Sequence, residues 1–207
     1  YSNTTGANNT ASGVNSLYSN TTGGSNTANG LNSLSSNTTG ANNTASGVGS
    51  LSSNTTGSGN IGIGPTNSGG TYTPVFNPAT ENNRVVMGST SVTNAYIQVA
   101  WTVVSDARDK TNFAPVPHGL SFLNALKPTA YQYTEDRESS TPNGPMRYGF
   151  LAQDILELEG ADSVIIDSED PDKLRYNGEA LVPVLVNAVQ ELSAMVEALQ
   201  AELDALS

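Results

Sequence analysis

A unit of 17 residues repeats through the first part of the chain. Its most constant part is Ser-Asn-Thr-Thr-Gly, which recurs at residues 2–6, 19–23, 36–40 and 53–57. A second glycine (Gly13, Gly30, Gly47) recurs between these, followed by one apolar residue and then a leucine (Leu17, Leu34, Leu51). Glycine supplies positive φ at corners and threonine suits extended backbone. Each unit is therefore predicted to form one coil of a β-solenoid or β-roll, with two short strands and two turns.

The repeat is poor in apolar side chains. A few apolar residues per unit cannot offset the conformational entropy lost when the backbone is ordered, so one chain alone is not expected to fold well. Three copies wound around a common axis would bring the repeated Leu, Val and Ala positions together, with Asn and Thr in ladders along the surface. The repeat therefore predicts a fibrous homotrimer. A disordered polar linker is the alternative, which the low hydrophobicity favours and the strict period disfavours.

Charge is divided unevenly along the chain. Residues 1–80 contain no Asp, Glu, Lys or Arg, so the 8 basic and 19 acidic residues and the net charge of −11 belong to the second part. This acidity argues against a nucleic-acid partner held by phosphate contacts. With no cysteine and a single histidine, His118, the chain is expected to have no disulfide, no metal site and no cofactor. No run approaches the roughly 18 apolar residues that span a bilayer, so no membrane insertion is expected.

The period breaks after Gly57. Residues 59–65 are followed by a stretch rich in Gly, Thr and Pro up to Pro78, and the whole is interpreted as a transition zone. Residues 84–104 are rich in β-branched and aromatic side chains, with interruptions at Gly88 and Asn94, and predict two or three strands. Trp101 is expected to pack in a core or at a subunit interface rather than stack on a ligand.

Ser105 and Lys110 lie where the two compositions meet. A serine hydroxyl near a lysine can act as a nucleophile if the amine is neutral, which burial or a neighbouring cation such as Arg108 would favour. Side chains five residues apart point away from each other on a strand and lie far around on a helix. A bend between Asp106 and Asp109 is therefore required. On this pattern alone, an ordinary turn or helix cap is the commoner explanation.

Residues 181–206 carry a heptad repeat of apolar side chains. Val182, Val189, Val196 and Leu203 fit position a, and Leu185, Leu192, Leu199 and Leu206 fit position d. Glu191, Glu197 and Glu202 are expected to be solvated charges. The heptads predict a coiled-coil helix, compatible with two or three strands. From 181 to 189, packing of the helix on its own domain is the alternative, and Pro183 marks a helix start.

Several motifs after residue 104 follow one another in the order typical of one family. They are Ser105-Asp106-x-Arg108-x-Lys110-x-Asn112, Gly119-Leu120, Leu126-Lys127-Pro128-x-x-Tyr131, Tyr148-Gly149-Phe150-Leu151-Ala152-Gln153, Leu174-Arg175-Tyr176 and Ala188-Val189-Gln190-Glu191-Leu192. On these motifs, residues 105–207 resemble the intramolecular chaperone, or peptidase S74, domain at the C-terminus of phage tail fibres and endosialidases. The 17-residue unit is also similar to repeats that often precede this domain.

The resemblance implies a domain that trimerises, nucleates folding of the fibre and is then released by autoproteolysis at Ser105. In this interpretation Lys110 removes the hydroxyl proton, and Asp106 or Asn112 orients the hydroxyl or holds the oxyanion. Attack on the preceding carbonyl closes a five-membered ring, so the expected cut lies between Val104 and Ser105. The implied partners are two further copies of the chain and the upstream fibre or other virion proteins. The implied location is the virion tail fibre, made in the host cytoplasm.

The sequence therefore predicts a mainly β fibre of trimeric β-roll or β-helix-like repeats, followed by an α+β chaperone domain that ends in a trimeric coiled coil. The expected segments are a shaft at 1–64, a connector at 65–104, the chaperone domain at 105–180 and the coiled-coil helix at 181–207. Residues 149–153 and 164–166 are expected to be core segments, with Gln153 a candidate buried hydrogen-bonding side chain.

The main alternative is a receptor-binding fibre tip that keeps its chaperone uncleaved. The exposed repeat surface, or the loop Thr71-Tyr72-Thr73, would then grip a host-surface glycan. A trimeric bacterial surface adhesin would share the repeats but would need a membrane anchor after the coiled coil. A membrane-anchored transcription factor with the same cleaving domain is disfavoured because the chain has no basic DNA-binding region.

Overall fold

A computed structural model describes residues 2–67, 69–134, 137–160 and 163–206. The chain divides into two compact units, Tyr1–Gln98 with Tyr133–Pro145, and Val99–Gln132 with Met146–Ser207. Residues 1 and 207, the outer ends of the predicted shaft and coiled coil, lie outside the described residues. Each unit has a buried interior of its own.

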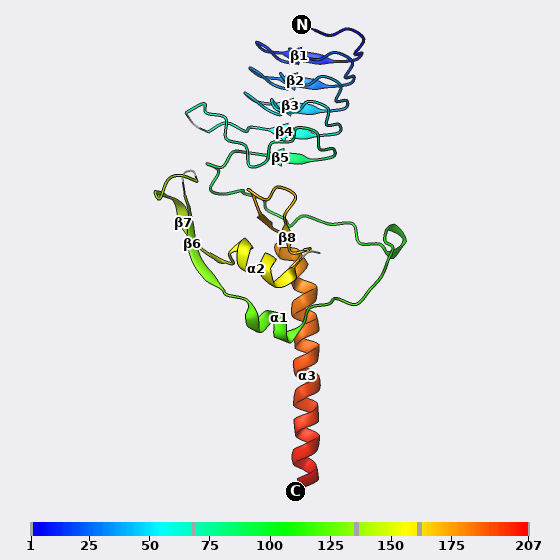
Figure 1. The fold of residues 1–207 in the computed structure, drawn as a ribbon, viewed down its shortest axis with the longest axis vertical. Helices are drawn as coiled ribbons and strands as arrows, with labels where there is room; N and C mark the ends of the chain where they lie inside the picture. The colour runs from blue at the N-terminus through cyan, green and yellow to red at the C-terminus, as the bar shows by residue number, and fades with distance from the viewer. Residues whose placement is uncertain (1, 68, 135–136, 161–162, 207) are drawn as a thin grey trace. The chain divides into compact units, whose positions relative to one another are not determined.

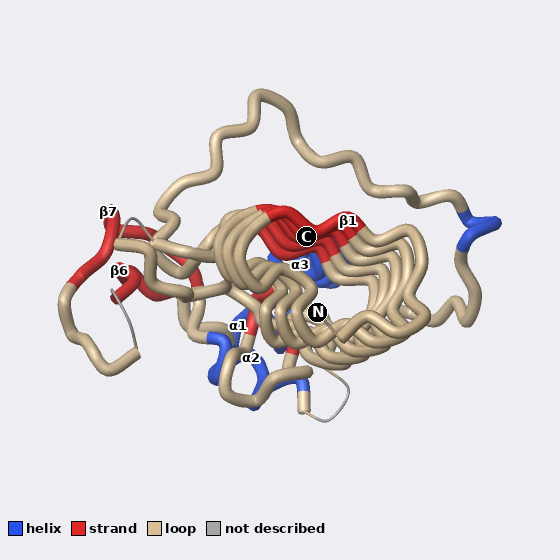
Figure 2. The backbone as a smooth tube through the Cα atoms, turned by 90° about the horizontal axis from the view of Figure 1, so that it is seen from above, coloured by secondary structure: helices blue, strands red, loops and turns tan. Residues whose placement is uncertain are grey.

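The first unit is built on a parallel β-solenoid. Five three-residue strands stack in chain order: β1 (Thr10–Ser12), β2 (Thr27–Asn29), β3 (Thr44–Ser46), β4 (Ile61–Ile63) and β5 (Val85–Met87). Thr10 pairs with Thr27, and Thr27 with Thr44, so the repeat itself sets the register. The coils are stacked in Figure 1 and superposed in the end-on view of Figure 2. The predicted solenoid is confirmed.

Each coil has one strand, so the prediction of two strands per unit is wrong. The rest of the coil runs through turns in which Asn15, Leu17 and Ser25 adopt positive φ of 57°, 50° and 58°. Backbone in this conformation bends too sharply for a second extended ladder. The turns are nevertheless joined from coil to coil by backbone hydrogen bonds, such as Thr21 N to Thr38 O at 2.9 Å.

Apolar side chains fill part of the interior of a single solenoid. Those buried are Leu17, Leu34 and Leu51 at one phase of the repeat, and Ala28 and Ala45 at another. The apolar residue after the second glycine points outward instead, and Val14 is 69% exposed. The expectation that Leu and Ala need an axis shared by three chains is therefore wrong, because one chain buries them. The homotrimer itself stays a prediction.

Buried asparagine ladders complete this interior. Asn37 Nδ2 donates to Asn20 Oδ1 at 2.8 Å and to Gly40 O at 2.9 Å, and Asn54 Nδ2 donates to Asn37 Oδ1 at 2.8 Å. A second buried ladder consists of Asn26, Asn43 and Asn60. These two asparagine ladders are internal and not on the surface as predicted, whereas the Asn15 to Asn32 contact is an exposed one. An amide offers two donors and an acceptor, so a polar coil can close on itself with few apolar side chains.

The stack continues past the last complete repeat. Ile61 of β4 pairs with Val85 of β5, so this coil is longer by seven residues, the difference between an offset of 24 and one of 17. One isolated bridge, Thr66 to Tyr72, lies within the longer loop, and a second joins Pro74 of this loop to Ser89 just after β5. Of the two or three strands predicted within 84–104, β5 is the one that forms.

Residues 94–117 are exposed along their whole length. Their one regular element in the described chain is a 3-10 turn, η1 (Ala107–Asp109). Extended residues form a strand only when a neighbour takes up their N–H and C=O groups, and residues 94–104 have no such neighbour among the described residues. Trp101 is 71% exposed. Core packing of Trp101 within this chain is therefore wrong, and packing at a subunit interface stays a prediction.

The second unit mixes short helices and strands. Its elements, with the β6 and β7 sheet that belongs partly to each unit, are α1 (Leu120–Ala125), β6 (Thr129–Thr134), β7 (Pro142–Gly149), α2 (Ala152–Glu159), β8 (Ile166–Asp167), β9 (Arg175–Tyr176), η2 (Gly178–Ala180) and α3 (Leu181–Leu206). The core consists of Phe122, Ile155, Ile165, Ile166, Leu181 and Val184. Of the expected core residues 164–166, Ile165 and Ile166 are in the core, whereas Val164 is 69% exposed. Gln153 is exposed on α2, so its predicted burial is wrong.

Two different stripes of α3 have different environments. Leu181, Val184 and Ala188 are buried, so the first two turns pack on the helix's own domain. The predicted a and d side chains lie on another stripe, where exposure runs from 44% at Leu185 to 86% at Leu206. The helix continues well past α1 in Figure 1. The coiled coil stays a prediction, and its seam is uncovered in the single chain.

By length and composition alone, the described residues contain one helix that is apolar enough to cross a membrane, Gly178–Leu206. The sequence pattern did not identify this helix as a candidate membrane span, because the helix has no long uninterrupted apolar run. Apolar residues recur here at heptad positions, with Glu191, Glu197 and Glu202 between them. This spacing is typical of a coiled coil.

Candidate functional site

Ser105 and Lys110 flank the single turn η1. Asp106 caps this turn, because its Oδ1 accepts the backbone N–H of Arg108 at 2.9 Å, a common role for aspartate at a helix start. The turn folds the chain back between the two side chains, and Lys110 Nζ donates to Ser105 Oγ at 2.6 Å. The bend that the five-residue spacing requires is present.

Asp106 and Arg108 form an ion pair beside this contact. Arg108 Nη2 lies 2.6 Å from Asp106 Oδ2, and Arg108 Nε lies 3.1 Å from both carboxylate oxygens. The guanidinium holds the pKa of Asp106 below its ordinary value, and the carboxylate raises the pKa of Arg108. The sequence assigned Arg108 to favouring the neutral form of Lys110 and Asp106 to orienting Ser105. In the structure these two side chains bind each other instead.

The remaining predicted residues lie on either side of η1. Val104 immediately precedes Ser105 in exposed, irregular chain. Asn112 follows Lys110 by two residues and has a φ of 56°, in the left-handed region that asparagine tolerates. No hydrogen bond joins Asn112 to Ser105 within the described chain. The structure therefore brings the serine and the lysine together and leaves the supporting residues apart from them.

The pair is open to solvent in the single chain. On either side of it in the sequence, residues 94–117 expose the apolar side chains of Tyr96, Ile97, Val99, Trp101, Val103, Val104, Phe113 and Val116. Water favours the charged form of an amine, whereas serine–lysine chemistry needs the neutral form. Ser105 and Lys110 are therefore close enough to exchange a proton, but in the single chain water is not excluded from them.

Helix α3 anchors the far end of the exposed segment. Asn187 Nδ2 donates to the carbonyl of His118 at 2.8 Å. Glu191 Oε2 accepts the N–H of Leu120 at 2.8 Å and so caps α1, whose N-cap residue Gly119 has no side chain to do this. Glu191 is a helix cap and not only the solvated charge expected. The sequence signal for this contact was Gly119 before the helix α1, because a glycine N-cap has no side chain and leaves the first N–H groups to another acceptor.

Ser105, the first residue of the paired site, is also where a family match begins. Residues 105–164 match Peptidase S74, the chaperone of endosialidase. The resemblance expected from the motifs is confirmed. This S74 segment runs through η1, α1, β6, β7 and α2 and ends before β8. The family supports a role as an intramolecular chaperone of a tail fibre, and it implies a trimeric fibre assembly within a phage particle. No curated protein and no solved structure matches the chain.

Two other kinds of site bear on function. No group of three or more His, Asp or Glu side chains is arranged to hold a metal ion in the parts of the chain that the structure describes. Outside the S74 segment, a polar hollow lies between the first two coils of the solenoid. Sequence reasoning did not locate it. The available signal was Tyr18, an aromatic residue where the next coils have Ser35 and Ser52.

Proposed function

We propose that this chain is the C-terminal part of a phage tail fibre in which the S74 segment and α3 act as an intramolecular trimerisation chaperone, and in which Ser105 cuts the chain once. The observation that carries the proposal is the 2.6 Å contact of Lys110 Nζ with Ser105 Oγ at the start of the S74 segment. The family match supports the chaperone role. The cut, the contacts between three copies and synthesis in the host cytoplasm belong to the proposal.

Two uncovered apolar surfaces support assembly of identical copies. One is the extended segment 94–104 with Trp101, and the other is the a and d stripe of α3. Contiguous exposed apolar surface marks an interaction site, and cyclic symmetry lets one chain cover both surfaces with copies of itself. Asn187 and Glu191 tie residues 118–120 to α3. Gathering three α3 helices would therefore also gather three S74 segments.

The proposed cut begins with transfer of the Ser105 hydroxyl proton to neutral Lys110 as Oγ attacks the carbonyl carbon of Val104. The ring formed has five members, whereas attack on the serine's own carbonyl would form a strained ring of four. The C–N bond then breaks, and the proton passes from Lys110 to the departing nitrogen. An ester between Val104 and Ser105 Oγ remains, which water hydrolyses to a Val104 carboxylate and a free Ser105 hydroxyl.

Assembly supplies the surroundings that this chemistry requires. Covering residues 94–117 with neighbouring copies removes water from the pair, which favours a neutral amine over an ammonium. It also strengthens any donor that holds the oxyanion, a role that we assign to Asn112 or to a group of a neighbouring copy. The cut therefore follows assembly, and an unassembled chain stays intact.

Intact mass under denaturing conditions measures the cut in the full chain. The unsubstituted chain is expected to give two fragments, residues 1–104 and 105–207, and Ser105→Ala a single full-length mass. Lys110→Arg keeps the charge and a donor but cannot act as a base, so it too is expected to stay whole. A full-length mass from the unsubstituted chain, or fragments from Ser105→Ala, would contradict the proposed cut.

Sedimentation equilibrium after refolding tests the chaperone role separately. Ser105→Ala is expected to refold to a trimer, because it keeps the S74 segment and α3 attached. Residues 1–104 expressed alone are expected to refold without forming trimers. Trimers formed equally well by residues 1–104 alone would contradict the chaperone role and leave the cut untouched.

A further inference from the structure

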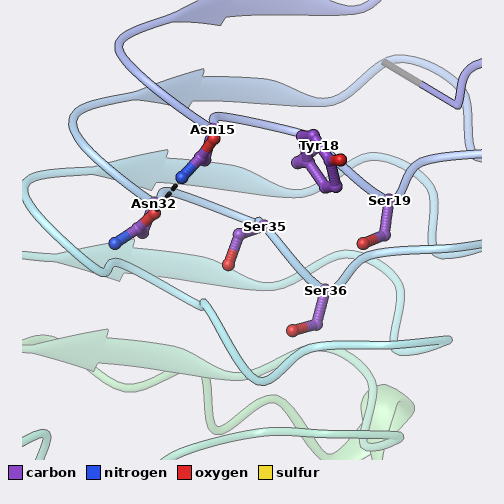
Figure 3. A pocket seen from close by; sticks show the side chains of 6 residues that line it. All are labelled: Asn15, Tyr18, Ser19, Asn32, Ser35 and Ser36. Atoms are coloured by element: carbon purple, nitrogen blue, oxygen red, sulfur yellow. Dashed lines mark hydrogen bonds between the residues drawn. The ribbon is translucent and has the colours of Figure 1, made fainter.

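A polar hollow of about 470 Å³ lies on one flank of the solenoid. Six side chains line it: Asn15, Tyr18, Ser19, Asn32, Ser35 and Ser36. Figure 3 shows that the first three come from one coil and the others from the next coil. Residues 1–80 contain no charged side chain. The hollow therefore combines an aromatic ring with neutral hydroxyl and amide groups.

The residue at this position changes along the repeat, with tyrosine at positions 1 and 18 and serine in the coils that follow. The position of Tyr18 is taken by Ser35 in the second coil and by Ser52 in the third. The small Ser35 leaves the space beside the ring open, and Tyr18 is 54% exposed. The coils that carry serine stack in the same register as the coil that carries tyrosine, so the fold does not require the ring.

The polar groups of the hollow have spare hydrogen-bonding capacity. Asn15 Nδ2 donates to Asn32 Oδ1 at 3.1 Å, and this ladder ends there because Gly49 occupies the same position in the third coil. Asn32 Nδ2 therefore keeps its protons for another acceptor. Among the described residues, the three serine hydroxyls of the hollow take part in no hydrogen bond. A ligand with several hydroxyls would find both donors and acceptors here.

The chain fills the equivalent place one coil further with a ring of its own. Tyr72 lies over Gly49, where an added Cβ atom would come within 2.8 Å of Tyr72 Cδ2. The Tyr72 hydroxyl donates to Asn77 Oδ1 at 2.7 Å and is also hydrogen-bonded to Ser52 and Ser53. Burial raises the pKa of this phenol. A six-membered ring that carries a hydroxyl thus fits on this face of a coil.

We propose that the hollow between the first two coils binds one neutral pyranose ring of a glycan. A pyranose has a face of C–H groups that packs on an aromatic ring such as Tyr18, and a rim of hydroxyls suited to serine and asparagine. A sugar that carries a carboxylate or sulfate would lose hydration there without gaining a cation, since residues 1–80 contain no Lys or Arg. This site is independent of the cut at Ser105.

Binding of the full chain to an array of printed glycans tests the site. The array carries neutral oligosaccharides of glucose, galactose and N-acetylglucosamine, together with sialylated and sulfated counterparts. We expect binding to a neutral set, with the affinity then measured by titration calorimetry. Tyr18→Ser gives the first coil the residue of the next two coils. It is expected to weaken binding about tenfold and to leave the unfolding midpoint unchanged.

Ser35→Tyr tests the same hollow in the opposite way. It places a ring at a position where the repeat already accepts one, and it is expected to fill the hollow and abolish binding. Thr10→Ser, on the exposed face of β1, is the matched control and is expected to bind like the unsubstituted chain. The proposal is overturned if no neutral glycan binds, if only acidic glycans bind, or if Tyr18→Ser and Ser35→Tyr both bind with unchanged affinity.

Discussion

The solenoid and residues 94–104 differ in whether their polar groups find hydrogen-bond partners within the same chain. In the solenoid the buried asparagine amides find partners one coil away in the same chain, as Asn37 does between Asn20 and Asn54. Residues 94–104 are richer in apolar and β-branched side chains, yet they form no strand and stay exposed. The more polar region is the one that closes on itself.

This contrast shows what determines whether such a chain can fold alone. Hydrophobicity favours burial, but a buried backbone or side-chain amide also needs a hydrogen-bond partner. The 17-residue repeat supplies that partner for its buried asparagines. Within the described chain, the backbone of residues 94–104 has no such partner, and the a and d stripe of α3 has no apolar surface covering it. We therefore expect the solenoid to be stabilised from within and the C-terminal region to be stabilised by assembly.

Charges in the seam of α3 are expected to have the largest effect. Leu192→Asp combined with Leu199→Asp puts two carboxylates at successive d positions, where three chains would bring six together without cations. Light scattering after size exclusion is expected to show monomer in place of trimer. Ala194→Asp with Ala201→Asp adds the same charge at the same spacing on an outer position, and this control is expected to remain trimeric. A trimer in the seam variant would contradict the predicted coiled coil.

Removal of one ladder amide is expected to destabilise the solenoid by about 3 kcal/mol. Asn37→Ala removes two donors and one acceptor from the buried ladder. Asn20 Oδ1 loses its donor from Asn37 and Asn54 Nδ2 loses an acceptor, whereas Gly40 O keeps its bond from Asn26. Urea unfolding followed by circular dichroism measures the loss. Asn29→Ser changes an exposed asparagine to the residue found at this position in the adjacent coils, and it is expected to cost less than about 0.5 kcal/mol. If both variants lost the same free energy of unfolding, the buried ladder would stabilise the solenoid no more than an exposed asparagine does.

The sequence predicted the register of the solenoid but not its interior. Identical residues 17 positions apart stack directly, as Thr27 does on Thr44, so the period alone indicated the coil. The period did not indicate that Asn20 and Asn26 point inward, because a surface ladder would satisfy amide groups equally well. Their direction depends on turns such as that at Leu17, where a positive φ carries the leucine and the next asparagine inside.

The site divides in the same way between local and distant residues. Ser105, Lys110 and the cap at Asp106 lie within six residues, so side-chain chemistry and a required bend were enough to predict their grouping. Glu191 lies 71 residues from Leu120, the N–H group that it caps. No local pattern connects two such residues, and their contact follows only from the packing of α3.

Substitution of Glu159 tests how far the second unit is stabilised by contacts within one chain. Its carboxylate accepts the backbone N–H groups of Val164, Ile165 and Ile166 at 2.9, 2.7 and 3.0 Å. Glu159→Gln replaces one acceptor oxygen with a donor and is expected to cost about 2 kcal/mol in thermal or urea unfolding. Glu157→Gln, exposed two residues earlier, is the control and is expected to have little effect. If both variants lost a similar free energy of unfolding, the cause would be the change in net charge and not the hydrogen bonds of Glu159.

Acid is expected to have the smallest effect, confined to the last coil of the solenoid. Glu81 Oε2 accepts the N–H groups of Ala79 at 2.7 Å and Thr80 at 3.0 Å. Hydrogen bonds from its own N–H and that of Ala79 lower the pKa of Glu81. Because the folded pKa lies below the unfolded value of about 4.3, this stabilisation is complete above that pH and is lost as the pH falls through the folded pKa.

Hydrogen exchange at Ala79 and Thr80 measures this effect as a change in protection factor between pH 6 and pH 3. We expect protection to fall several-fold in the unsubstituted chain. In Glu81→Gln it should already be low at pH 6 and change little on acidification. The amide of Thr21, which donates to Thr38 O at 2.9 Å, is the internal control because residues 1–80 carry no titrating carboxyl side chain. An equal loss at Thr21 would mean that acid opens the whole solenoid, and the contrast between a self-contained solenoid and an assembly-dependent C-terminal region would then fail.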